Sequence, residues 1–388
     1  MLSAVVNYDY ELEQMDVKTA FLHGDLEERI LMQQPEGFIK KGDENKVCLL
    51  RKSLYGLKQS PRQWNLLLYV DDMLIASGSM AEIRLVKESL SKKFEMKDLG
   101  KASRILGMDI IRDREKGTLK LSQENYIEKV LKAFGMTEAK PTITPLATHF
   151  RLKSLTKDER KEEAIHMEGT PYASAVGSLM YAMIGSRPDL AFAVGVISRF
   201  MSNPGRDHWT AVKWVLRYLR GASQDCLTFT KNKDFSIEGF CDSDYATDLD
   251  KRRSVTGFIF KVWGNTVSWR SNLQSVVALS TTEAEYMALS SAVKEAIWLK
   301  SLCEELGFGA GAVKIHCDSQ SALALAKNSV HHERTKHIAT KYHFIRDIVA
   351  DGTVKLFKIH TSRNPADFLT KALPGPKFQL CCDLVNIA

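Results

Sequence analysis

The sequence predicts an α/β chain of the α+β kind. Its second half contains short strand-like runs separated by turns, followed by alternating helix and strand, a pattern typical of a mixed sheet with helices packed on it. Its first half contains an apolar run on each side of two acids, which indicates a hairpin. With 388 residues, of which 44% are hydrophobic and 26% charged, the chain has ordinary globular composition and room for two or three domains.

Charge, cysteine content and apolar runs exclude several classes of protein. The net charge of +7 allows a polyanionic partner without requiring one. Seven Cys at irregular spacing, without a CxxC pair, argue against a disulfide framework or a zinc ribbon. No apolar run reaches the ~20 residues of a membrane span, and the first residues lack the basic and apolar parts of a secretory signal. We therefore expect an intracellular protein, cytoplasmic or nuclear, that is neither secreted nor bound in a membrane.

The first predicted domain covers residues 1–145. Apolar residues around Asp71 and Asp72 predict a hairpin over 66–76, and the apolar spacing of 80–94 is helical. Residues 109–135 fit a strand, a turn, a second strand and a helix. Pro141 and Pro145 end that section.

A linker and helices are expected over residues 146–224. Residues 151–169 are rich in charge and poor in apolar side chains, which predicts an exposed linker. Helices are predicted over 172–184, 191–201 and 208–221. The last helix carries Lys213, Arg217 and Arg220 on one face, which is either a solvated basic surface or a surface that follows phosphates.

Residues 225–388 are expected to form the mixed sheet and its helices. Strands are predicted over 235–241, 257–263, 266–269, 276–279, 313–317 and 354–359. Helices are predicted over 281–306, 319–327 and 336–350, with a last helix from Pro365.

Four acids of this region lie at element ends or on a buried helix face, where side chains from different elements can meet. They are Asp242, Glu285, Asp318 and Asp367. Hydrolysis of a phosphodiester with divalent metal needs several carboxylates at one point, holding two ions ~3.5–4 Å apart. Three of the acids also have purely structural explanations: an acidic turn for Asp242, an N-cap for Asp318 and a place in the first turn of a helix for Asp367. Their combination nevertheless predicts a metal site.

Glu285 is the hardest of these acids to explain by helix stability. Helical spacing places it with Ala288 and Ala292 on the apolar face that should cover the sheet. The nearby Ser280 and Glu283, by contrast, fit a capping box. A carboxylate on the apolar face costs free energy unless a cation pairs with it. The cation is either a metal ion or a Lys or Arg from elsewhere in the chain.

The strings around these acids resemble the RNase H domain of copia-type (Pseudoviridae) retrotransposon Pol polyproteins. They include FCDSDYATDLDKRRSVTGFIF, STTEAEYMALSSAVKEAIWL, IHCDSQSALALAKN and IHTSRNPADFLTK, within about residues 235–372. The resemblance implies that Asp242, Glu285, Asp318 and Asp367 bind Mg²⁺, with Mn²⁺ as an alternative. It further implies cleavage of the RNA strand of an RNA–DNA hybrid, and His360 resembles the mobile histidine that assists product release.

The predicted hairpin of the first half ends in Asp71 and Asp72, which is either an ordinary acidic turn or the metal-binding edge of a polymerase palm. A third acid must then come from another strand, and Asp16 in EQMDVKTAF fits. With QQPEGF and CLLRKSLYGLKQSPRQW, these strings resemble the reverse transcriptase of the same elements. The resemblance implies metal binding and catalysis by these three acids, with Gln59 and Arg62 at the nucleotide and template site.

Parts of the family's reverse transcriptase are expected to be missing. The chain begins only a helix and a strand before Asp16, without most of the fingers subdomain, and PRQWN runs directly into LLLYVDD, where family members carry further residues. A polymerase must hold primer, template and nucleotide together. We therefore expect impaired RNA-directed DNA polymerase activity.

The whole prediction is a truncated polymerase palm, a helical connection and an RNase H-like mixed sheet with flanking helices. The expected partners are an RNA–DNA hybrid, a primer–template and other parts of a Pol polyprotein. The alternative is a degenerate relic that binds nucleic acid without catalysis.

Overall fold

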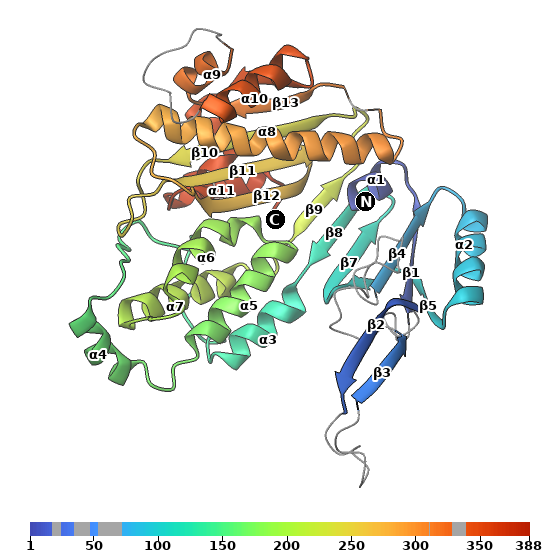
Figure 1. Cartoon of the computed structure of the whole chain (residues 1–388), viewed down its shortest axis with the longest axis horizontal. Coiled ribbons are helices and arrows are strands. Elements are labelled where there is room, and N and C mark those ends of the chain that lie inside the picture. The colour runs from blue at the N-terminus through green and yellow to red at the C-terminus, as the bar shows by residue number, and fades with distance from the viewer. Residues whose placement is uncertain (18–24, 35–46, 53–71, 310, 328–338) are drawn as a thin grey trace. The chain divides into compact units, whose positions relative to one another are not determined.

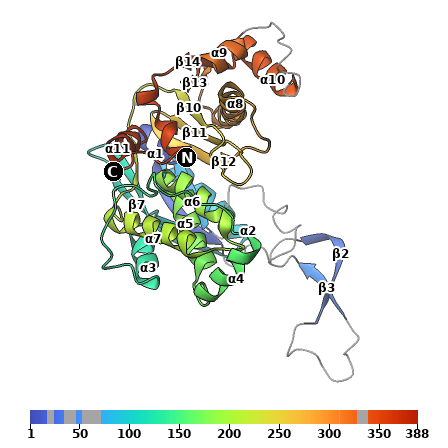
Figure 2. The same cartoon turned by 90° about the vertical axis from the view of Figure 1, so that its left-hand side faces the viewer.

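The computed structural model of the chain describes residues 1–17, 25–34, 47–52, 72–309, 311–327 and 339–388. They divide into two compact units, essentially Ser3–Leu106 and Gly107–Ala388, whose elements are drawn in Figures 1 and 2. Helices and several sheets confirm the predicted α+β class. The predicted division at residues 145 and 224 stays a prediction. Among the described residues, no helix is long and apolar enough to cross a membrane.

The first unit is built on a three-stranded antiparallel sheet in the order β4-β1-β5. A separate pair, β2 and β3, is also antiparallel. The elements are α1 (Leu2–Asn7), β1 (Glu11–Val17), β2 (Asp25–Gln33), β3 (Val47–Lys52), β4 (Asp72–Ser77), α2 (Met80–Lys93), β5 (Met96–Lys101) and β6 (Arg104–Ile105).

Helix α2 confirms the helix predicted over 80–94 and packs on the three-stranded sheet. Its Leu90 joins Met15 of β1 and Met73 of β4 in a buried cluster. Its buried Lys87 lies 2.8 Å from a carboxylate oxygen of Glu13 and 2.6 Å from one of Asp98, so the ammonium is paired with both neighbouring strands. Strand β4 is the described part of the predicted hairpin, whose residues 66–71 lie outside the described residues.

The second unit begins with two antiparallel strands and a group of helices. Strand β8 pairs with β7 on one side and with β9 on the other. The elements are β7 (Met108–Asp113), β8 (Thr118–Ser122), α3 (Glu124–Ala133), α4 (Lys157–His166), α5 (Tyr172–Gly185), η3 (Pro188–Leu190), α6 (Ala191–Ile197), η4 (Ser198–Phe200), α7 (Arg206–Gly221) and β9 (Leu227–Thr230).

The structure shows two features of this region that the sequence did not predict. The charged stretch predicted as a linker contains the exposed helix α4, whose N-terminus is closed by a capping box of Thr156 and Glu159. On α7, Arg217 and Arg220 donate to the backbone carbonyls of Lys140 and Thr137 at 2.6 and 2.5 Å. These two guanidinium groups therefore tie α7 to the segment after α3.

The main sheet of the second unit has five strands in the order β12-β11-β10-β13-β14. Strands β10, β11 and β12 are antiparallel neighbours, whereas β13 runs parallel to β10 and β14 parallel to β13. The elements are β10 (Ile237–Asp244), β11 (Val255–Val262), β12 (Asn265–Leu273), α8 (Thr281–Glu305), β13 (Val313–Cys317), α9 (Gln320–Lys327), α10 (Ala339–Ala350), β14 (Val354–Lys358), η6 (Thr361–Arg363), η7 (Pro365–Leu369) and α11 (Gly375–Leu384).

Helix α8 lies across this sheet, as Figure 1 shows. Its buried face is rich in small residues, among them Ala284, Ala288 and Ala292, which let the helix approach the strands closely. Ser280 caps its N-terminus by accepting a hydrogen bond from the Glu283 N–H at 3.1 Å, as its sequence pattern predicts.

Two predicted elements differ from the structure. Residues 276–279 do not form a strand, and Val276, Val277 and Leu279 are exposed. Apolar composition alone suggested a strand there, but these residues have no partner strand in the described sheet. The helix expected from Pro365 is the short η7, and a full helix begins only at Gly375.

Candidate metal centre

Asp242 belongs to strand β10 and is only 2% exposed. Its cross-strand neighbour on β11 is Gly257. A Cβ at Gly257 would lie 2.7 Å from the Thr370 methyl and 2.8 Å from the Leu369 Cβ, so glycine is needed for the segment around η7 to approach the strand. The Thr370 hydroxyl then donates to the Asp242 carboxylate.

Asp367 reaches the same place through η7, which the Asn364 side chain holds in position. The Asn364 amide oxygen accepts a hydrogen bond from the Ala366 N–H at 3.1 Å, and the Asn364 amide nitrogen donates to the Cys241 carbonyl at 3.0 Å. This fixes η7 beside the end of β10. Asp367 is 2% exposed.

Asp318 follows strand β13, which lies parallel to β10 with Cys317 opposite Cys241. Asp242 and Asp318 therefore leave neighbouring strands at the same edge of the sheet. One carboxylate oxygen each of Asp242, Asp318 and Asp367 lies within 4.8 Å of the others.

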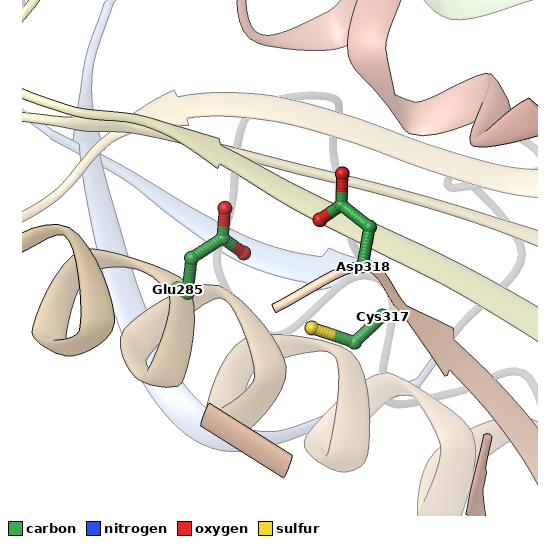
Figure 3. A group of neighbouring side chains, drawn as sticks. All are labelled: Glu285, Cys317 and Asp318. Atoms are coloured by element: carbon green, nitrogen blue, oxygen red, sulfur yellow. The ribbon is translucent and has the colours of Figure 1, made fainter. Parts of the chain in front are cut away.

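Glu285 brings the fourth carboxylate from helix α8. A carboxylate oxygen of Glu285, one of Asp318 and the Cys317 sulfur lie within 4.8 Å of one another. Figure 3 shows the Glu285 and Asp318 carboxylates approaching from the helix and from the strand end. Because Asp318 belongs to both groups, all four predicted acids are brought together.

Burial and mutual repulsion dominate the electrostatics of this acid cluster, by which we mean Asp242, Glu285, Asp318 and Asp367. Burial raises the pKa of Asp242 to about 6, where Lys371 opposes the shift and Asp367 adds to it. Burial, followed by the charge of Asp242, raises the pKa of Glu285 to about 10. One oxygen of Glu285, Oε2, is buried without a hydrogen-bond partner among the described residues. A divalent cation would satisfy this orphan acceptor and relieve the repulsion.

Two lysines that the sequence analysis missed lie against the acid cluster. The Lys371 ammonium is 3.6 Å from an oxygen of Asp242 and 3.2 Å from one of Asp367. The Lys377 ammonium is 3.3 Å from the other oxygen of Asp367. Lys371 follows Asp367 by four residues, a spacing typical of helical ion pairs, and this signal could have found it. Lys377 comes from α11, whose position only the tertiary structure reveals.

His360 lies on an exposed turn and is absent from the groups of ligand atoms that meet within 4.8 Å in the described part of the chain. Its Nδ1 is 2.7 Å from the Ser362 hydroxyl. Lys377 donates to the carbonyls of Thr361 and Ser362 at 3.0 and 2.6 Å, and thereby links this turn to Asp367.

The acids predicted for the first unit are only partly described. Asp16 and Asp72 are cross-strand neighbours on β1 and β4. The two oxygens of Asp72 accept from the Gln14 amide at 3.3 Å and from the Leu106 N–H at 3.1 Å. Asp71, Gln59 and Arg62 lie outside the described residues.

A family model matches the first part of the chain. Its description is reverse transcriptase (RNA-dependent DNA polymerase), and it matches residues 1–68 and 66–148. The two matched stretches meet at the point where the sequence runs from PRQWN directly into LLLYVDD.

Retrotransposon proteins match the chain far more widely. The chain is 51% identical over 420 residues to the retrovirus-related Pol polyprotein from transposon TNT 1-94 of Nicotiana tabacum, covering all of this chain and 32% of the relative. It is 35% identical over 412 residues to the corresponding polyprotein from transposon RE1 of Arabidopsis thaliana, covering 98% of this chain and 28% of the relative. The chain thus spans about a third of the length of these relatives.

A shorter relative is covered completely. A transposon Ty5-1 protein of Saccharomyces cerevisiae is 32% identical over 314 residues, which is 72% of this chain and 100% of that protein. A solved RNase H1 isolated from compost aligns with 35% of this chain and 92% of its own chain, at 18% identity and a TM-score of 0.28. A TM-score this low carries no argument about the fold, whose description rests on the strand order given above. On the sequence matches, the chain belongs to the Pol polyprotein family of copia-type retrotransposons.

Proposed function

We propose that the second unit is a metal-dependent nuclease that cuts the RNA strand of an RNA–DNA hybrid. The observation that carries the proposal is the meeting of Asp242, Glu285, Asp318 and Asp367 from three strand or turn segments and one helix. Carboxylates that the fold brings together despite their mutual repulsion are typical of a metal centre for phosphoryl transfer.

Oxygen ligands of this kind suit a hard divalent cation, Mg²⁺ or Mn²⁺. The four acids would hold it, and when bound it supplies an activated water and charge stabilisation for the phosphodiester. The residues of the chain perform the remaining tasks. Thr370 and Asn364 orient Asp242 and the η7 turn, and Lys371 and Lys377 keep the crowded carboxylates neutralised. The exposed His360, on a turn that Lys377 links to Asp367, suits a role in product release.

A hybrid-cleavage assay on the purified chain tests this proposal. The wild-type protein should cut a labelled RNA strand in an RNA–DNA hybrid with Mg²⁺ and leave it intact with EDTA. Asp318→Asn should lower the rate by about a hundredfold or more, since an amide is a poor ligand for these ions. Asp234→Asn, at an exposed turn, is the matched control and should cut normally. Unchanged cleavage by Asp318→Asn would refute the assignment.

A second candidate function is binding of nucleic acid without cleavage. It is favoured by the two ammonium groups of Lys371 and Lys377 that already neutralise Asp242 and Asp367. Salt-dependent binding of the hybrid, with no cleavage in Mg²⁺ or Mn²⁺, would select this candidate.

For the first unit we propose a polymerase remnant. Asp16 and Asp72 lie opposite each other on β1 and β4, as a palm requires. However, the alignment with the tobacco relative covers 420 residues against 388 in this chain, so that relative carries segments that are missing here. We expect little or no extension of a primed RNA template, and extension at a rate comparable to hybrid cleavage would overturn this proposal.

A further inference from the structure

A cavity of about 240 Å³ borders the acid cluster in the second unit. Its walls come from residues 146–152, from helix α6 and the η4 turn, and from the loop that follows β10. Phe150, Phe192 and Leu249 form an apolar part, and Arg199, Lys371 and Asp244 are among the charged lining residues. This volume is below that of a pocket for a drug-sized ligand and suits a smaller group.

Lys371 joins the cavity to the acid cluster. The same side chain that lines the cavity places its ammonium 3.6 Å from Asp242 and 3.2 Å from Asp367. A polymer whose phosphate lies at the acid cluster would therefore have its neighbouring unit at the mouth of this cavity.

Arg199 gives the cavity an incompletely compensated positive charge. Its side chain is 19% exposed, its Nε donates to the Gly195 carbonyl at 3.2 Å, and its guanidinium lies 3.8 Å from Asp248. Burial lowers the pKa of Arg199 even though Asp248 and Asp250 oppose the shift. One backbone carbonyl and one carboxylate at 3.8 Å engage only part of the guanidinium, whose five N–H donors can also meet an anion in the cavity.

The carboxylate of Asp244 is the opposing charge in the lining. It accepts a hydrogen bond from the Thr247 hydroxyl at 2.9 Å, which holds it on its own loop. Together with Arg151, the lining contains three cationic side chains against this one acid. Lys371 is already paired with Asp242 and Asp367, so Arg199 and the exposed Arg151 are the side chains of the lining that favour an anionic occupant.

We propose that this cavity binds the sugar–phosphate unit next to the cleaved linkage of the RNA strand, with Arg199 contacting its phosphate. The apolar wall of Phe150, Phe192 and Leu249 covers the sugar. This inference rests on the proposed nuclease function, and it adds a substrate subsite built partly from the helical segment that precedes the main sheet. Arg199 and Lys371 are thus the residues that set the position of the strand.

Neutral-linkage scanning tests the subsite. A short RNA–DNA hybrid is prepared with one methylphosphonate linkage at successive positions of the RNA strand, and its affinity is measured without divalent metal. The cut site of the unmodified hybrid in Mg²⁺ fixes the numbering. For the wild-type chain we expect a several-fold loss of affinity when the neutral linkage lies next to the cut site. Arg199→Met should bind the unmodified hybrid several-fold more weakly, with a salt dependence reduced by about one phosphate contact.

The decisive measurement combines the Arg199→Met substitution with the neutral linkage next to the cut site. Arg199→Met should show no further loss when the adjacent linkage is neutral, whereas Lys129→Met, an exposed change on α3, should retain the wild-type pattern. A full additional loss in Arg199→Met, or a wild-type chain insensitive to every flanking linkage, would overturn the subsite.

A second variant covers the case in which Arg199→Met does not fold. Thr148→Trp places a large side chain at an exposed position of the cavity lining without removing any charge. It should weaken hybrid binding several-fold while the thermal unfolding temperature stays unchanged, and unchanged binding would count against the subsite. If the wild-type chain binds and cuts the hybrid but these variants behave like it, only the subsite fails. If the wild-type chain does not cut, the proposed function itself fails.

Discussion

Glu285 carries a carboxylate into the acid cluster from a helix face otherwise lined by alanine and leucine. Its raised pKa of about 10, against an ordinary value of 4.5, means that the folded protein without metal holds this proton while the unfolded chain releases it. The folded state therefore loses stability as the pH rises from about 4.5 toward 10. A neutral amide at this position removes that loss.

We accordingly expect Glu285→Gln to stabilise the metal-free protein near pH 8. The gain in free energy of unfolding should be about 1–2 kcal/mol, and it should disappear near pH 4, where the carboxyl is protonated in both states. Thermal unfolding in EDTA at the two pH values measures it. A variant equally destabilised at both values would show that Glu285 has a packing role instead.

Binding of a divalent cation should release protons. At pH 7 the metal-free Glu285 is protonated and Asp242, with a pKa of about 6, is largely ionised. A bound cation needs both ionised, so about one proton should leave per chain at pH 7. Isothermal titration with Mn²⁺ in buffers of different ionisation enthalpy measures this number, and Glu285→Gln should reduce it to near zero. Equal release by both proteins would place the proton elsewhere.

The meeting of the four acids could be predicted from sequence because each lies at a strand end, a helix start or an inward helix position. Asp318 directly follows a strand, and Glu285 interrupts an apolar stripe, so both positions carry a local signal. Lys377 has no such signal, since α11 returns to Asp367 only in the folded chain. The same holds for Gly257, whose missing side chain admits Thr370.

At the scale of elements, a buried ion pair within the η3 turn is hydrogen-bonded to α7 and the residue that follows it. Arg187 and Asp189 are both fully buried, with nitrogen–oxygen distances from 2.7 to 3.2 Å. The Tyr218 hydroxyl also donates to Asp189 at 2.7 Å, and Arg187 donates to the Ala222 carbonyl at 2.6 Å. The Arg187 guanidinium thus links the turn before α6 to the C-terminal end of α7.

Removing the negative partner should leave this guanidinium buried without compensation. We expect Asp189→Asn to lower the free energy of unfolding by about 3–5 kcal/mol. Glu304→Gln breaks a half-exposed pair with Lys300 and should change it by less than about 1 kcal/mol. Denaturant unfolding of the two variants measures the difference. A similar small effect for both would mean that water or another group compensates Arg187.

The elements that sequence patterns predicted correctly are those with a regular buried face, such as α8 and β13. Residues 276–279 show the limit, because Val276, Val277 and Leu279 have strand-like composition but remain exposed. Helix α4 shows the opposite case. It buries no residue, so hydrophobic spacing gave no signal, although the Thr156 and Glu159 capping pattern was present in the sequence.

At the scale of the whole molecule, contacts cross the predicted boundary at residue 224. Strand β9 pairs with β8, the Trp269 indole donates to the Met183 carbonyl at 3.1 Å, and the Ser154 N–H and hydroxyl both donate to Asp250. A fragment of residues 225–388 would expose the buried Leu227 and Phe229 of β9.

We therefore expect residues 107–388 to unfold in a single cooperative transition. The shorter fragment 225–388 should melt more than about 5 °C lower, since the apolar surface it exposes is worth several kcal/mol. Calorimetry of both fragments measures this. Equal melting temperatures would instead support a nuclease domain that begins at residue 225.

Strand β9 also accepts the last residues of the chain, because Cys226 and Ala388 exchange backbone hydrogen bonds of 3.1 and 3.3 Å. Residues 386–388 thereby cover the edge of β9 that does not pair with β8. An uncovered edge strand presents unpaired N–H and C=O groups to which another chain can add. This short pairing therefore protects the sheet of β7, β8 and β9 from edge-to-edge association with a second molecule.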